Sequence, residues 1–182
     1  MEVARLNLCA PLPIVDEEPI LDSMLGWLAR WLRMLGVHAI YSPSFNDESL
    51  LSINHLLITR DRELFRKRSL PTLLLETSIH EEWLSISSLI LGTQLVINMD
   101  RSLCPICGSK LVKVSREAVV NKVPGSVLLR HDSFWLCTGC GKVYWVGSHH
   151  MRIGKELEIA RYILSRLKAS CVGNNLLIIH NN

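Results

Sequence analysis

Two pairs of cysteines in the second half of the chain have the spacing of a metal site. Cys104 and Cys107 form one C-x2-C pair, Cys137 and Cys140 form another, and 29 residues separate the two pairs. Two intervening residues allow a tight turn to aim both sulfurs at one ion, and Zn²⁺ takes four thiolates in a tetrahedron. Because a site with four cysteine ligands leaves no open coordination position, we expect a structural Zn²⁺ here and not a catalytic one.

Disulfide formation and redox chemistry are the alternatives for these cysteines. The N-terminus lacks the charged region and apolar core of a signal peptide, so we expect a cytoplasmic protein, in which disulfides are rare. A redox C-x2-C pair stands at the start of a helix in a thioredoxin-like fold, and neither pair has that setting. Strand-forming residues surround the pairs and predict a β zinc ribbon, with strands near 110–114, 126–129, 134–136 and 142–146.

Carboxylates in the first half of the chain could bind a different kind of metal ion. Asp22 and Asp61 each follow an expected strand, and Asp47 and Glu48 begin an expected helix between them. Sites in open parallel sheets gather beyond the carboxyl ends of the strands, and clustered carboxylates attract Mg²⁺ or Mn²⁺. Two such ions can activate water for phosphodiester hydrolysis. The alternative is that each acid only stabilises a helix start, which suits Asp47 and Glu48 better than the other two.

One face of the first expected helix combines an acid with two arginines. Asp22, Gly26, Arg30 and Arg33 lie on one stripe, and the other faces are apolar. Arg30 could hold a phosphate through two parallel hydrogen bonds. The alternative is an amphipathic helix whose wet stripe carries two solvated arginines. The apolar run of this helix, 23–35, is too short to span a bilayer, so we expect no membrane association.

The elements that must position these residues alternate between short apolar strands and helices. This order predicts an α/β domain in which helices pack on a parallel sheet. The expected strands lie near 19–22, 37–41, 55–59 and 72–75, and the expected helices are 23–35, 46–54, one that opens at Arg60, and 79–91.

Charge is distributed unevenly between the two halves. Residues 1–103 carry 9 basic and 13 acidic side chains, whereas residues 104–182 carry 11 basic and 4 acidic ones. The contrast predicts two modules with different roles. The basic half could attract nucleic acid, or its charges could form an ordinary solvated surface.

Several motifs in order resemble a known family. They are DSMLGWLARWLRMLG (22–36), NDESLL (46–51), LITRDREL (57–64), the two cysteine pairs, FWLC (134–137) and VYWVGSH (143–149). Over about residues 20–152, this series resembles the Mut-seven C-terminal ribonuclease family. That family is described as a PIN-like nuclease domain fused to a zinc ribbon.

The resemblance implies a three-layer α/β domain with an acidic ribonuclease site that depends on Mg²⁺ or Mn²⁺. Its acids would be Asp22, Asp47 or its neighbour Glu48, and Asp61, with Glu63 as a fourth candidate. Arg30 matches the arginine of the family's first helix. His149 matches the histidine after the ribbon, where it could face RNA or the active site, or tie the ribbon to the nuclease domain.

Three features depart from the family pattern. Trp27 stands where the family usually has arginine, the first strand is preceded by Glu17-Glu-Pro, and the segment between Leu51 and His55 is shorter than usual. The chain therefore divides into an N-terminal arm (1–18), a PIN-like domain (19–101), a zinc ribbon (102–152) and a C-terminal helix and tail (153–182). The tail is expected to hold a helix over 156–168 and a short strand, or partner-pairing segment, over 176–179.

These observations together predict a metal-dependent ribonuclease whose zinc ribbon helps to bind RNA. The residues expected to hold the RNA backbone are Arg30, Arg33, Lys110, Lys113, Arg116, Lys122 and Arg130. The alternative is a catalytically silent RNA-binding module that docks on a ribonucleoprotein such as the ribosome. A DNA-binding zinc protein fits less well, because no recognition helix follows the cysteine pairs.

Overall fold

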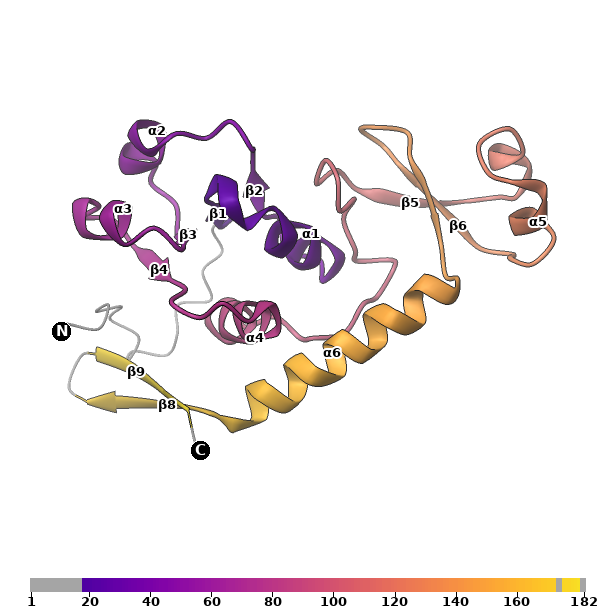
Figure 1. Cartoon of the computed structure of the whole chain (residues 1–182). Coiled ribbons are helices and arrows are strands. Elements are labelled where there is room, and N and C mark those ends of the chain that lie inside the picture. The colour runs from indigo at the N-terminus through magenta and orange to yellow at the C-terminus, as the bar shows by residue number, and fades with distance from the viewer. Residues whose placement is uncertain (1–17, 173–174, 181–182) are drawn as a thin grey trace.

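The computed structural model describes residues 18–172 and 175–180 (Figure 1). Within these ranges, the side chains of 148–151, 167–172 and 175–180 are not described, and only their backbone is. An α/β domain comes first, with β1 (Ile20–Leu21), a 3-10 turn (Ser23–Leu25), α1 (Gly26–Met34), β2 (Ile40–Tyr41), α2 (Asp47–Ser52), β3 (Leu57–Thr59), α3 (Arg62–Lys67), β4 (Thr72–Leu74) and α4 (His80–Leu91). A β module follows, with β5 (Leu111–Val114), a 3-10 turn (Glu117–Val119), α5 (Gly125–Leu128), β6 (Phe134–Cys137) and β7 (Val143–Trp145). The last elements are α6 (Ser148–Arg166), β8 (Leu167–Val172) and β9 (Asn175–His180).

The sheet of the first domain is parallel, as its strand and helix order predicts. The strand order is β2-β1-β3-β4. Ile20 of β1 aligns with Ile40 of β2 on one side and with Leu57 of β3 on the other. The chain thus leaves β1 toward one edge and later returns to build the other edge. The boundary between β1 and β3 is the topological switch point, where ligands bind in folds of this kind.

Alternate residues of the strands face two different helical layers. Leu21 and Ile58 belong to a core with residues of α1, α4 and α6, whereas Leu57 packs with Leu50 of α2 and Leu64 of α3. Because neighbouring residues of a strand point to opposite faces, this division shows helices on both sides of the sheet. The predicted three-layer α/β arrangement is confirmed.

The C-terminal helix belongs to the core of the first domain. In Figure 1, α6 leaves the β module and runs along α4. Leu157 and Ala160 are buried in the same core as Leu84, and the Ser85 hydroxyl donates a 2.8 Å hydrogen bond to the Ala160 carbonyl. The helix begins at Ser148 instead of residue 156, because Ile153 extends its apolar face upstream. The predicted boundary between residues 152 and 153 therefore falls within a continuous helix.

The β module is a three-stranded antiparallel sheet, β5-β6-β7, over a small core of its own. One expected strand is wrong, because 126–129 lies in the helical turn α5. The carbonyl of Pro124 accepts hydrogen bonds from the amides of Val127 and Leu128. These two side chains cover the small core from a helical connection, so the apolar character of this run misled the prediction.

The ends of the chain meet the predictions to different extents. β8 and β9 pair in an antiparallel hairpin, which confirms a strand over 176–179. Of the predicted arm 1–18, only Glu18 is among the described residues. Within the described part of the chain, no helix has the length and apolar character needed to cross a membrane.

Candidate metal centre and active site

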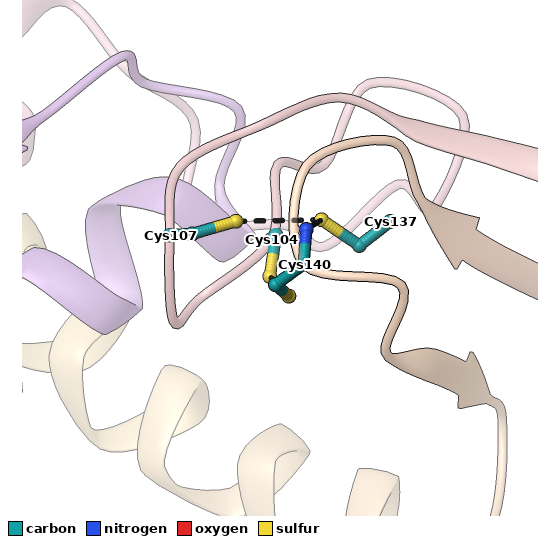
Figure 2. A group of neighbouring side chains, drawn as sticks. All are labelled: Cys104, Cys107, Cys137 and Cys140. Atoms are coloured by element: carbon teal, nitrogen blue, oxygen red, sulfur yellow. Dashed lines mark hydrogen bonds between the residues drawn. The ribbon is translucent and has the colours of Figure 1, made fainter.

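The four cysteines of the two pairs converge on one point (Figure 2). Their Sγ atoms all lie within 4.8 Å of one another, with 3.7 Å between Cys104 and Cys140 and 3.4 Å between Cys107 and Cys137. A regular tetrahedron with Zn–S bonds of about 2.3 Å has edges of about 3.8 Å. All four are free thiols and not disulfides. The cluster therefore has the chemistry and the dimensions of a Zn²⁺ site.

Two glycines allow the cysteine turns to close. Gly108 and Gly141 follow the two pairs with φ angles of 77° and 71°, a region that side-chain-bearing residues rarely adopt. Their amides donate to the carbonyls of Cys104 and Cys137, at 2.8 and 3.1 Å. Each pair is thus held in a local turn, which explains why spacing alone identifies the cluster.

The thiols differ in how readily they ionise. Hydrogen bonding with Ser109 lowers the pKa of Cys107 to about 6, and burial raises the pKa of Cys137. A divalent cation would stabilise all four as thiolates, because metal ligation requires the deprotonated form.

Arg33, which the sequence interpretation assigned to RNA binding, joins this cluster to helix α1 through a buried guanidinium. It is 5% exposed, its Nε donates to the Ala39 carbonyl at 3.0 Å, and its Nη1 donates to the carbonyls of Pro105 and Ile106 at 3.5 and 3.0 Å. Burial lowers its pKa, and the nearby thiols oppose that shift. Four thiolates around Zn²⁺ carry a net charge of −2, so the guanidinium would offset part of that charge while orienting the first cysteine turn.

Asp22 is the most enclosed of the predicted acids. It follows β1 at the switch point and is 5% exposed. The Thr59 hydroxyl donates to its Oδ2 at 2.7 Å, and the Ser23 hydroxyl donates to its Oδ1 at 3.1 Å. The carboxylate is therefore held in one orientation by groups from two neighbouring strand ends.

Asp61 connects to the same threonine but also stabilises a helix. Its amide donates to the Thr59 hydroxyl at 2.9 Å. Its Oδ1 accepts from the amides of Glu63 and Leu64, at 2.6 and 3.0 Å, as the N-cap of α3. Thr59 thus links Asp22 and Asp61, although the sequence interpretation gave it no role. Thr59 lies at a strand end directly before Arg60 and Asp61, and this position in the sequence could have indicated a role in the site.

The remaining predicted acids lie on the surface. Asp47 and Glu48 occupy the first turn of α2, whose N-cap is Asn46, and Glu63 lies in the first turn of α3, near Lys67. Among the residues whose side chains the structure describes, the four cysteines form the only group of three or more His, Cys, Asp or Glu side chains placed to hold one metal ion. The acids therefore do not form a preassembled cluster of three.

An aromatic group that the sequence interpretation missed lies on α1 and α4. Trp27 stacks on His80 with ring centroids 4.7 Å apart, and His80 contacts Trp83 at 4.5 Å. The Arg60 guanidinium lies 4.9 Å from the centre of the Trp83 ring. Trp27 therefore packs α1 against α4.

The predicted basic residues differ in availability. Arg30, Lys110, Lys113, Lys122 and Arg130 are exposed, whereas Arg116 pairs with Asp132. The side chain of His149 lies outside the described residues.

Fold and site together define an α/β domain with an oriented acid at its switch point, joined to a ribbon with four cysteines. The family model described as the Mut7-C RNAse domain matches residues 18–157. This match covers most of the chain, which therefore belongs to the Mut7-C RNase domain family, and membership indicates a ribonuclease-like function. Comparisons with curated proteins and with solved structures give no match.

Proposed function

We propose that the protein hydrolyses RNA phosphodiester bonds at the switch point of its parallel sheet, with Asp22 as the central acid. The observation that carries the proposal is the orientation of the buried Asp22 carboxylate by Thr59 and Ser23. A buried carboxylate is costly to retain unless its surroundings compensate it, and such groups concentrate at functional sites.

Asp22 and Asp61 are the residues that would hold Mg²⁺ or Mn²⁺. Mg²⁺ commonly takes one or two carboxylates and completes its shell with water, so a cluster of three acids is not required. The bound ion would supply activation of water and neutralisation of charge on the phosphate. Asp22 would orient the attacking water, whose oxygen adds to phosphorus as the P–O bond to the leaving oxygen breaks. The water gives its proton to solvent, and the leaving oxygen takes up a proton from solvent. Asp47, Glu48 and Glu63 would act only at longer range.

RNA backbone binding would fall to exposed cations on both modules. Arg30 is exposed on α1, and the ribbon contributes Lys110, Lys113, Lys122 and Arg130. Such contacts would release counterions and make binding weaken with salt. Zn²⁺ on the four cysteines would hold the ribbon in shape, which is a structural role.

The test is cleavage of a mixed single-stranded RNA pool with Mn²⁺, comparing wild type with Asp22→Asn. We expect a loss of about 100-fold or more, because the variant keeps the shape but not the charge of the acid. Asp132→Asn makes the same change in the ribbon and should cleave as wild type does. Equal zinc content and melting temperature would exclude unfolding, and equal cleavage by Asp22→Asn would contradict the proposal.

A catalytically silent RNA-binding module is the second candidate. The observation that favours it is that the described acids do not assemble into a group of three, while Asp61 already caps a helix. Such a module would dock on a ribonucleoprotein through its basic surface. RNA binding by the wild type, without cleavage above the Asp22→Asn background, would support this second function.

A further inference from the structure

A cleft of about 750 Å³ is lined by residues of helix α1, the ribbon and α6. Trp27 and Arg30 line it from α1, Lys142 and Trp145 line it from the ribbon, and Arg152 lines it from α6. Its volume lies within the range of about 300–1,000 Å³ that is typical of ligand pockets. The cleft is built from both modules, so neither module contains it alone.

The groups that line the cleft suit an unpaired polynucleotide. The indoles of Trp27 and Trp145 offer surfaces on which bases could stack. Among the described residues that line the cleft, four are cationic and one, Glu156, is a carboxylate. The buried Arg33 is already bonded to carbonyls, which leaves Arg30, Lys142 and Arg152 to meet an anion. Base stacking beside a cationic track is the usual mode of single-strand binding, and it requires bases that are not paired.

Trp27 is held rigidly enough to act as a platform. Its ring stacks on His80 with an interplanar angle of 22° and lies 5.2 Å from the ring of Trp31. A ring fixed in this way loses little side-chain entropy when a base stacks on it. Trp145 belongs to β7, opposite Phe134 of β6, so its backbone is also fixed.

One wall of the cleft is connected to the acid at the switch point through hydrogen bonds. Gly26 and Tyr41 line the cleft, and the Tyr41 hydroxyl donates to the Ser23 carbonyl at 2.9 Å. Ser23 is the residue directly after Asp22 and donates to its carboxylate. RNA lying in the cleft would therefore contact residues that support the carboxylate that we assign to hydrolysis, although Asp22 itself is not among the residues that line the cleft.

We propose that this cleft binds single-stranded RNA, with bases stacked on Trp27 and Trp145 and phosphates paired with Arg30, Lys142 and Arg152. The proposal deepens the proposed ribonuclease function, on which its catalytic meaning rests, by naming unpaired RNA as the substrate class. Duplex RNA would bind more weakly, because its bases are already stacked and paired. The binding itself does not depend on catalysis and can be measured without it.

The experiment is fluorescence anisotropy with the zinc-loaded full chain, without added Mg²⁺ or Mn²⁺. The probe is a labelled ten-nucleotide single-stranded RNA, compared with the same strand in a duplex. Arg152→Glu should weaken single-strand binding by about 10-fold and lower the salt dependence, since it removes one phosphate contact. Lys155→Glu makes the same charge change on the exposed surface of the same helix, outside the cleft, and should bind as wild type does.

The aromatic contribution needs a conservative variant, because Trp27 also packs against two helices. Trp27→Ala should weaken binding by about 10-fold, and Trp27→Tyr should restore most of it, since tyrosine retains a stacking ring. Three outcomes would each overturn the proposal that the cleft binds single-stranded RNA. They are equal affinity of Arg152→Glu and Lys155→Glu, no single-strand binding by wild type, and duplex binding as tight as single-strand binding. Binding in the cleft without cleavage would contradict only the hydrolysis proposal. If the Arg152→Glu and Trp27→Ala variants cleave RNA as wild type does, only the proposal that RNA binds in the cleft would be contradicted.

Discussion

The cysteine cluster and the acid site are built in opposite ways. Each cysteine pair closes in a local turn with a glycine behind it, so the ligands are arranged by a few neighbouring residues. The acid site takes Asp22 from one strand and Thr59 and Asp61 from another, so it exists only when β1 and β3 pair. The first site should therefore depend on its metal, and the second on the packing of the whole domain.

Loss of Zn²⁺ should have the largest effect, and it should be confined to the ribbon. We expect Cys107→Ser to abolish stoichiometric zinc binding and to unfold residues 102–147, because zinc binding supplies about 10–16 kcal/mol in modules of this type. The α/β core should persist, since its buried cluster contains no ribbon residue. The zinc content of the variant and hydrogen–deuterium exchange of the backbone amides in the two modules would check this.

Ser126→Ala provides the control for that experiment. Ser126 lies on α5, is exposed, and is not a ligand. The Ser126→Ala variant should keep its zinc, and the backbone amides of both modules should stay protected from hydrogen exchange. Simultaneous loss of protection in the α/β domain of Cys107→Ser would contradict the view that the two sites depend on different parts of the structure.

The success of the sequence predictions follows the same division between local and distant interactions. The cysteine turns were predictable from spacing, because near neighbours close each turn. The parallel sheet was predictable because strands that alternate with helices favour parallel pairing. The strand expected at 126–129 was wrong, because burial against the ribbon core, and not β propensity, determines its conformation. The placement of Arg33 was not predictable, because its partners at Pro105 and Ile106 lie far along the chain.

The acid site shows what remains beyond prediction. Sequence position suggested that Asp22 and Asp61 share one sheet edge, and the shared contact with Thr59 agrees with that placement. Their catalytic role stays a prediction, as do the roles of Asp47, Glu48 and Glu63. A pattern shows which strand ends carry carboxylates. It does not show which oxygen atoms are already occupied by a helix amide or a hydroxyl group.

Arg33→Met should show how strongly the two regions are coupled. Methionine retains much of the buried volume but leaves the carbonyls of Ala39 and Ile106 without their donor, so we expect a loss of about 2–3 kcal/mol. Chemical denaturation would measure the loss. Arg30→Met is the matched control, because Arg30 is exposed on the same helix, and it should change the free energy of unfolding by less than about 0.5 kcal/mol. Equal effects of the two changes would contradict the structural role of Arg33.

Thr59→Val should weaken the acid site while leaving the zinc site intact. The change preserves shape but removes the donor to Asp22 and leaves the Asp61 amide without its acceptor. We expect cleavage to fall by about 10-fold or more, because misplacement of a reacting group is costly, and stability to fall by about 1–2 kcal/mol. Thr59→Ser retains the hydroxyl and should recover most of the activity. Wild-type cleavage by Thr59→Val would show that its hydroxyl does not position the acid.

Gly26→Ala should have the smallest effect. Whether it raises or lowers the free energy of unfolding is more informative than the size of the change. A Cβ at this position would lie 2.6 Å from the Tyr41 hydroxyl, which must then move and release its hydrogen bond to Ser23. Alanine is otherwise favoured over glycine in a helix by about 1 kcal/mol, so the steric cost opposes an intrinsic gain. We expect a net loss of about 1 kcal/mol and slower cleavage, since the displaced tyrosine supports the residue beside Asp22. Gly154→Ala in α6 meets no atom within 4 Å and should be neutral or stabilising. Stabilisation of both variants in thermal melts would mean that Tyr41 adapts without cost, and that the acid site tolerates more local movement than its connected hydrogen bonds suggest.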